Sequence, residues 1–159
     1  MNSAHRLVQV LSERKLTLCT AESCTGGGVA TRITSVPGAS ACYLGSVVAY
    51  ANQLKIHALG VPEQTIATHG AVSEPVAVAM ARGGRERLLA DYCISITGIA
   101  GPGGGSPEKP VGLVFIGIAG AAHAVVEELH FHGSRAEIQS QAIDHAIAML
   151  LDFLNPGDV

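Results

Sequence analysis

The sequence has no tryptophan, and aromatic residues make up only 4% of its 159 positions. Charged residues are also scarce at 14%, the net charge is −3, and no run of lysines or arginines occurs. Grooves for nucleic acid combine basic residues with stacking aromatics, so this composition argues against a nucleic-acid partner. Because 48% of the residues are hydrophobic, we expect some surface to be buried in a homo-oligomer, a dimer or larger.

Long hydrophobic runs are absent as well. No apolar stretch reaches the ~18 residues of a membrane span, and Met1–Arg6 opens an amphipathic pattern, without the hydrophobic segment of a signal peptide. We therefore expect a cytoplasmic protein that has no membrane partner. The length suits one domain, residues 1–159, with a hydrophobic core.

The usual spacings of metal ligands are missing. The four cysteines do not form a C-x-x-C pair, and no H-E-x-x-H occurs, so we predict no metal and no cofactor. His130 and His132 are expected to share one strand face, but two ligands make a poor site. Cys19, Cys42 and Cys93 lie in apolar runs and are predicted to be buried.

The hydrophobic pattern predicts helices that alternate with strands. Helices are expected over 3–14 (with Ser3 as its cap), 26–35, 52–59, 73–89 and from the capping box Ser134-x-x-Glu137 onward, and strands over 16–21, 43–50, 91–97, 111–119 and 123–131. This order predicts an α/β fold, a three-layer α/β/α sandwich with a mixed sheet.

The segment Thr20-Ala21-Glu22-Ser23-Cys24-Thr25-Gly26-Gly27-Gly28 joins a predicted strand to a predicted helix. Backbone N–H groups at such a turn can stabilise an oxyanion, and glycines let a ligand approach the backbone closely. Ser23 is therefore a candidate nucleophile. Alternatively, the hydroxyls only cap the helix and the glycines only permit close packing.

Lys55 is one of three lysines and follows a predicted buried strand that ends at Tyr50. A partly desolvated lysine has a lowered pKa and can act as a general base, and the Tyr50 hydroxyl could bond to the same centre. The alternative is a solvated lysine on a helix, which is the more common situation.

A glycine-rich loop, Gly98 to Pro110, follows another predicted strand. It lacks the Lys-Ser/Thr pair of a nucleotide triphosphatase, and no helix follows it as in a dinucleotide fold. Such loops can hold a phosphate through N–H groups, or they can simply be mobile. Arg135 opens the last helix, where a cation is unfavourable unless an anion binds or a carboxylate pairs with it.

Five motifs in order resemble the CinA C-terminal domain family of competence/damage-inducible proteins. They are Thr20–Gly27, Tyr50-Ala51-Asn52-x-x-Lys55, His69–Val76, Thr97–Pro102 and Gly104–Gly112, and the likeness extends over about residues 5–154. The resemblance implies an amidohydrolase that converts nicotinamide mononucleotide and water to nicotinate mononucleotide and ammonia, a step of pyridine nucleotide salvage. It implies a Ser–Lys mechanism without a metal and a small mononucleotide as the partner.

Matching residues in the family motifs imply catalytic roles for Ser23 as nucleophile, Lys55 as base and Tyr50 as a supporting hydroxyl. The substrate-binding residues expected on the same basis are Glu22, Cys24, Thr25, Gly26, Gly98, Ala100, Gly101, Gly103 and Arg135. Two alternatives remain open at this point. One is a non-catalytic nucleotide-binding module linked to competence or DNA damage. The other is a thiol hydrolase with Cys24 as nucleophile.

Overall fold

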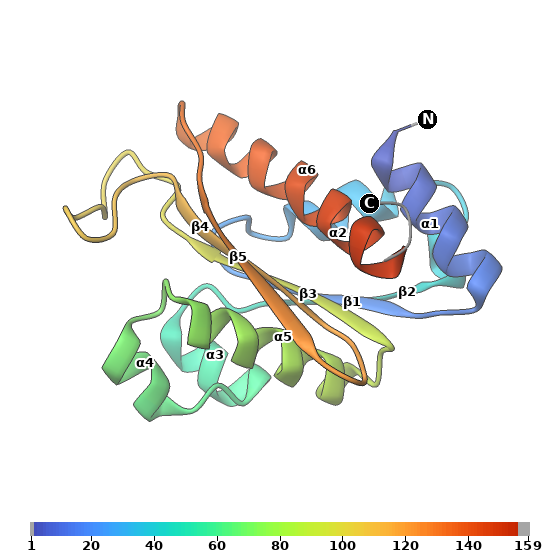
Figure 1. The fold of residues 1–159 in the computed structure, drawn as a ribbon, viewed down its shortest axis with the longest axis horizontal. Helices are drawn as coiled ribbons and strands as arrows, with labels where there is room; N and C mark the ends of the chain where they lie inside the picture. The colour runs from blue at the N-terminus through green and yellow to red at the C-terminus, as the bar shows by residue number, and fades with distance from the viewer. Residues whose placement is uncertain (1, 156–159) are drawn as a thin grey trace.

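The computed structural model describes residues 2–155, which form a central sheet with helices on both sides (Figure 1). The strands are β1 (Leu18–Glu22), β2 (Tyr43–Val48), β3 (Tyr92–Gly98), β4 (Leu113–Ala119) and β5 (Ala124–His130). The helices are α1 (Ser3–Arg14), α2 (Gly28–Thr34), α3 (Asn52–Leu59), α4 (Glu63–His69), α5 (Glu74–Leu88) and α6 (Arg135–Leu154), with a short 3₁₀-helix η1 (Ala39–Ala41). The predicted α/β/α sandwich is confirmed.

The sheet has the strand order β2-β1-β3-β4-β5. Strands β2, β1 and β3 are parallel, whereas β4 and β5 are antiparallel to their neighbours, so the sheet is mixed as predicted. Glu22, the last residue of β1, lies opposite Val48 of β2 and Ile96 of β3. The segments that follow these three strands therefore leave the sheet at the carboxyl ends of the strands, where parallel sheets commonly bind their ligands.

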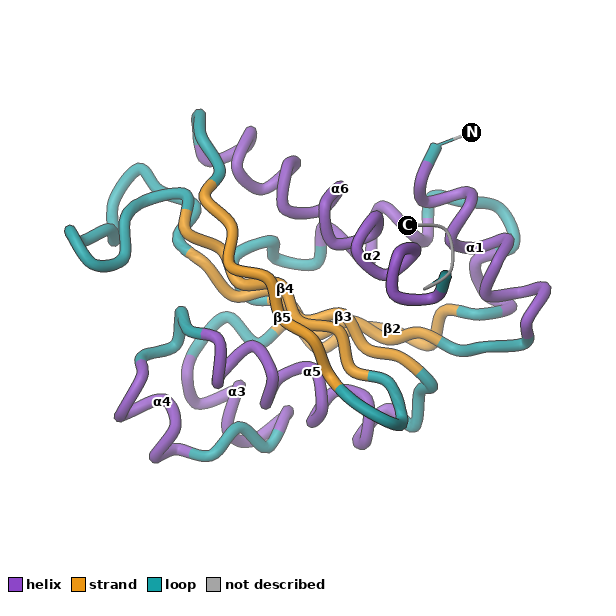
Figure 2. The backbone as a smooth tube through the Cα atoms, in the orientation of Figure 1, coloured by secondary structure: helices purple, strands orange, loops and turns teal. Residues whose placement is uncertain are grey.

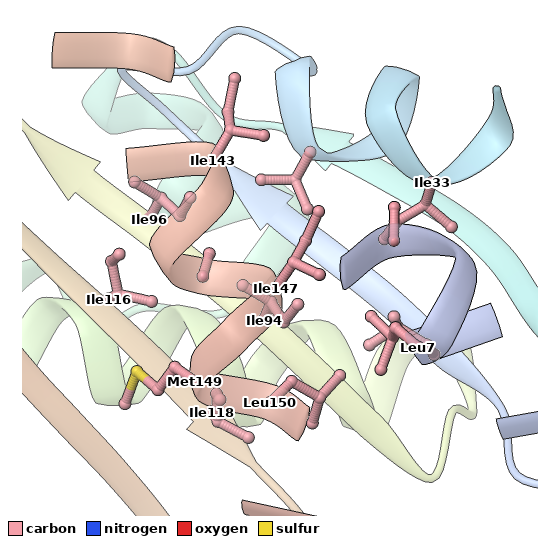
Figure 3. Packing of buried hydrophobic residues seen from close by; sticks show 14 of the residues in the cluster. Leu7, Ile33, Ile94, Ile96, Ile116, Ile118, Ile143, Ile147, Met149 and Leu150 are labelled. Atoms are coloured by element: carbon pink, nitrogen blue, oxygen red, sulfur yellow. The ribbon is translucent and has the colours of Figure 1, made fainter. Parts of the chain in front are cut away.

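The larger part of the core lies between the sheet and the layer formed by α1, α2 and α6. Figure 3 shows Ile147 and Leu150 of α6 close to Ile94 of β3 and Ile118 of β4. Isoleucine and leucine recur along α6 at helical spacing, which gives the helix one apolar face. Burial of each such side chain contributes roughly 1.5–3 kcal/mol, so α6 is firmly held across the sheet.

The opposite layer consists of α3, α4 and α5, which Figure 2 shows on the other side of the sheet. Helix α5 packs against the sheet through Val76 and Met80, which are fully buried with Ala21 and Leu59. Gly84 permits a close approach, because a Cβ atom there would lie 2.7 Å from the Cys93 sulfur. Cys19, Cys42 and Cys93 are buried, as predicted.

Two short elements were not expected from the sequence. Helix α4 has no buried residue, so it lacks the apolar stripe that would have predicted it. The 3₁₀-helix η1 follows the turn at Pro37-Gly38 and is too short to give a periodic signal.

Two details of the predicted elements were wrong. The cap of α1 is Asn2, whose side chain accepts from the Ala4 amide at 2.9 Å, and not Ser3, which lies inside the helix. Asn and Ser are nearly equivalent as caps, so the sequence did not decide between them. Strand β5 ends at His130, so His132 lies beyond it and the two histidines do not share a strand face.

Candidate active site

Ser23 is the first residue after β1, at the carboxyl ends of the parallel strands. Its amide donates to the Ile96 carbonyl at 3.0 Å, which ties the turn to β3. Gly26 and Gly27 take φ values of 59° and 96°, a region that favours glycine, and they turn the chain into α2. The amides of Cys24 and Thr25 donate to no other residue within positions 2–155.

Lys55, from the first half of α3, is buried with only 1% of its surface exposed. Its Nζ atom contacts Ser23 Oγ at 3.0 Å, the Ala49 carbonyl at 2.8 Å and the Tyr50 carbonyl at 3.3 Å. The solvated lysine considered as the alternative is therefore excluded. The strand-to-helix segment between β2 and α3 curves its carbonyl groups around the amine and aims it at the hydroxyl of Ser23.

Burial lowers the pKa of the Lys55 amine below its ordinary value of 10.5, because the charged form loses its water. A lowered pKa raises the fraction of neutral amine near neutral pH, and only the neutral amine can take a proton. The pair of Ser23 and Lys55 thus combines a hydroxyl with a base at hydrogen-bond distance.

Cys24 lies beside Ser23, but its thiol is poorly suited to attack. Burial raises the pKa of Cys24 to about 12, so the thiol is neutral near pH 7, and the thiolate is the nucleophilic form. The Cys24 carbonyl accepts a hydrogen bond from Gln139 Nε2 at 2.8 Å. Sequence reasoning missed Gln139, although it follows Arg135 by four residues and so lies on the same face of α6.

Arg135, the first residue of α6, lies beside the glycine-rich loop. Its guanidinium donates to the Gly101 carbonyl at 2.9 Å and to the Tyr50 hydroxyl at 3.1 Å. Tyr50 is 62% exposed, and its hydroxyl is on Arg135, whereas only its carbonyl contacts Lys55. This differs from the expected placement of that hydroxyl at the Ser23–Lys55 centre.

A cavity of about 220 Å³ lies beside Tyr50, Arg135 and the glycine-rich loop. Its lining comes from the turn after β1, the segment after β2, the loop after β3 and the start of α6, namely Cys24, Tyr50, Gly98, Ile99, Ala100, Gly101, Gly103, Gly104 and Arg135. The loop is closed at its base by hydrogen bonds of Ile99 with Leu113 and Gly112. Seven of the twelve predicted site residues line this cavity, whereas Ser23 and Lys55 are not among its lining residues.

Three predicted substrate-binding residues lie apart from the cavity lining. Glu22 is 0% exposed, and Thr25 donates its hydroxyl to the Glu22 carboxylate at 2.6 Å. Gly26 is exposed but does not line the cavity. The contact of Thr25 and Gly26 with a substrate stays a prediction, whereas the carboxylate of Glu22 has no exposed surface to offer a ligand.

Two larger-scale properties concern the described part of the chain, residues 2–155. There, no three His, Cys, Asp or Glu side chains gather closely enough to hold a metal ion. None of the described helices has the length and apolar character needed to cross a membrane.

The model of the CinA C-terminal domain family matches residues 1–154. The chain belongs to this family. A CinA-like protein of Chlorobaculum tepidum is 51% identical over 150 residues, which cover 91% of this chain and 36% of the relative. A putative competence-damage inducible protein of Symbiobacterium thermophilum is 48% identical over 155 residues. The chain thus spans about a third of the length of these CinA relatives, 36% in both cases.

Solved structures of CinA proteins have the same fold. The competence/damage inducible protein of Agrobacterium tumefaciens is 39% identical with a TM-score of 0.92, and the match covers 94% of this chain and 92% of that one. A CinA superfamily protein of Escherichia coli is 35% identical with a TM-score of 0.92, over 95% of this chain and 88% of that one. The family resemblance found in the sequence motifs is therefore confirmed.

Proposed function

We propose that this CinA-family chain hydrolyses the carboxamide of nicotinamide mononucleotide, with Ser23 as nucleophile and Lys55 as general base. The observation that carries the proposal is the 3.0 Å contact between Lys55 Nζ and Ser23 Oγ. An amide is a weak electrophile, so its hydrolysis needs an activated nucleophile and a stabilised oxyanion. The choice of nicotinamide mononucleotide as substrate rests on the resemblance of the sequence motifs to the family.

In the first half of the reaction, neutral Lys55 takes the proton of Ser23 as Oγ attacks the carboxamide carbon. The amides of Cys24 and Thr25, which are unused by other described residues, are the candidate donors to the oxyanion. As the C–N bond breaks, the Lys55 ammonium returns its proton to the leaving nitrogen. Ammonia departs and an ester of Ser23 remains.

In the second half, Lys55 takes a proton from water while the water oxygen attacks the ester carbon. The bond to Ser23 Oγ then breaks, and Lys55 returns the proton to Oγ. The products are nicotinate mononucleotide and one ammonia for each water consumed, and the enzyme is restored. No step requires a metal ion or an organic cofactor.

Arg135 and the loop from Gly98 to Gly104 are the proposed site of the substrate phosphate. The two hydrogen bonds that Arg135 makes leave several of the five guanidinium N–H donors unused. Tyr50 holds the guanidinium through its hydroxyl and borders the amine of Lys55 through its carbonyl. It therefore connects the proposed phosphate site with the Ser23–Lys55 pair.

The test is to incubate the purified chain with nicotinamide mononucleotide and measure ammonia together with nicotinate mononucleotide. Equal amounts of the two products, formed over many turnovers, would support the proposal. Calorimetric binding of the nucleotide without product would instead favour the non-catalytic binding module. The absence of both binding and turnover would contradict both functions.

A further inference from the structure

The carboxylate of Glu22 is buried beneath the turn that carries Ser23. Its surface is 0% exposed, yet five donors point at it. Oε2 accepts from Thr25 Oγ1 at 2.6 Å, Gly27 N at 3.2 Å and Val29 N at 3.1 Å. Oε1 accepts from Ala30 N at 2.9 Å and Thr20 Oγ1 at 3.2 Å. Both oxygens are occupied, so a ligand has no access to them.

Four of the five donors belong to the turn or to the start of α2. The residue that precedes α2, Gly27, has no side chain to cap the helix, so the amides of Val29 and Ala30 would otherwise lack partners. Glu22 supplies those partners from the end of β1. It therefore fixes the chain on both sides of Ser23, Cys24 and Thr25.

The main chain of Glu22 also reaches the segment that holds Lys55. The Glu22 carbonyl accepts from the Ala49 amide at 2.8 Å, and the Ala49 carbonyl accepts from Lys55 Nζ at 2.8 Å. One residue thus connects the turn of the nucleophile with the backbone around the base. A displacement of Glu22 would change the distance between Ser23 Oγ and Lys55 Nζ.

We propose that Glu22 is a positioning residue, whose buried carboxylate sets the conformation of the turn and thereby the alignment of Ser23 with Lys55. The inference rests on the proposed function, since it assumes that Ser23 is the nucleophile. It replaces the expected direct contact between Glu22 and substrate with an action through the turn. Misplacement of reacting groups by about 1 Å can lower a rate about 10²-fold.

The experiment compares Glu22→Gln and Glu22→Asp with the wild type. Gln keeps the shape but turns an NH₂ group toward N–H donors, and Asp keeps the charge but withdraws the carboxylate from the turn. Both variants should lower kcat about 10²-fold, as expected for misaligned groups, with little change in KM. Glu86→Gln, at an exposed position on α5, controls for the chemical change alone. Circular dichroism and thermal unfolding measure the folded fraction of each variant.

Thr25→Val keeps the test decisive if the Glu22 variants fail to fold. It removes the 2.6 Å bond from the turn to the carboxylate and leaves the other four donors in place. The inference predicts a lower kcat for folded Thr25→Val at a nearly unchanged KM. A kcat per folded molecule within about twofold of the wild type in every folded variant would overturn it, because misalignment costs far more than that.

A second readout separates this inference from the choice of substrate. A fluorophosphonate reacts with an activated serine, and peptide mass spectrometry locates the adduct. Labelling of wild-type Ser23 without turnover of nicotinamide mononucleotide would reject the substrate only, and slower labelling of the variants would still support the role of Glu22. Unchanged labelling rates in the variants would contradict that role. Absence of both labelling and turnover in the wild type would overturn both proposals.

Discussion

At the scale of single residues, Lys55 decides what the site can do. Lys55 is buried and surrounded by two carbonyls and a hydroxyl, which is the arrangement that the proposed proton transfer requires. Cys24 and Lys55 differ in the direction in which burial shifts their pKa values. Burial raises the pKa of Cys24 and lowers that of Lys55, so the thiol is kept neutral while the amine becomes available as a base.

Lys55→Met should change how stability depends on pH. The pKa of Lys55 is lowered by burial in the folded protein, so between that value and 10.5 the unfolded chain binds more protons. Stability of the wild type therefore rises through this window as pH rises, and the variant lacks this gain. Urea unfolding at several pH values up to about 10 measures the difference between the two proteins.

The matched control is Lys15→Met, at an exposed lysine after α1. The free energy of unfolding of the wild type is compared with that of Lys55→Met as pH rises. A fall of the wild-type value relative to the variant would contradict the claim that the buried amine loses its proton in the folded protein.

Arg135→Ala should impair the reaction of a nucleotide more than that of its nucleoside. Loss of a hydrogen bond to a charged group costs roughly 1.5–3 kcal/mol, so kcat/KM for nicotinamide mononucleotide should fall far more than for nicotinamide riboside. Steady-state kinetics with both substrates measure this. Tyr50→Phe, which removes one contact to Arg135, should show the same preference more weakly. Equal losses for the two substrates would make Arg135 structural.

At the scale of helices and strands, the sequence predicted the elements that have a regular hydrophobic pattern and missed those that lack one. Strands β1 and β4 are buried along their whole length, and β4 reads as an uninterrupted apolar run. Helix α6 begins with the predicted capping box of Ser134 and Glu137. Helix α4 has no buried face and therefore left no pattern in the sequence.

The site shows the same division. The position of Ser23 in the turn after β1 and that of Arg135 at the start of α6 follow from local signals. The burial of Lys55 and the contact of Gln139 with the Cys24 carbonyl depend on packing between distant segments, which no local pattern encodes. The position of the Tyr50 hydroxyl on Arg135 joins residues 85 positions apart.

Helix α5 makes a close contact with the end of α3 that can be tested. A Cβ atom on Gly83 would lie 1.7 Å from the carbonyl oxygen of Leu59, so Gly83→Ala must push the two helices apart. Overpacking of this kind typically costs about 1–3 kcal/mol. Gly103→Ala, where a Cβ meets nothing within 4 Å, is the control for stability. Equal unfolding midpoints for the two variants would contradict the packing described.

At the scale of the whole molecule, the described residues leave β2 at one edge of the sheet. Its sequence has no charged residue, and Leu44 is 51% exposed. Natural edge strands usually carry charges or proline that prevent pairing. This surface agrees with the expectation of a homo-oligomer, which stays a prediction.

Light scattering on the eluting peak of a sizing column measures the molar mass in solution. The prediction is a multiple of 16.3 kDa, the mass of one chain. A mass of one chain at all accessible concentrations would contradict the predicted oligomer.

The central claim is that the hydroxyl of Ser23, activated by Lys55, attacks the amide. The most direct measurement is ammonia release from nicotinamide mononucleotide by Ser23→Ala and Cys24→Ser, each compared with the wild type. Ser23→Ala should lower kcat by about 10³-fold or more, as for other activated nucleophiles. Cys24→Ser should retain most of the activity. Near-normal kcat in Ser23→Ala, or loss of activity in a folded Cys24→Ser alone, would contradict the account.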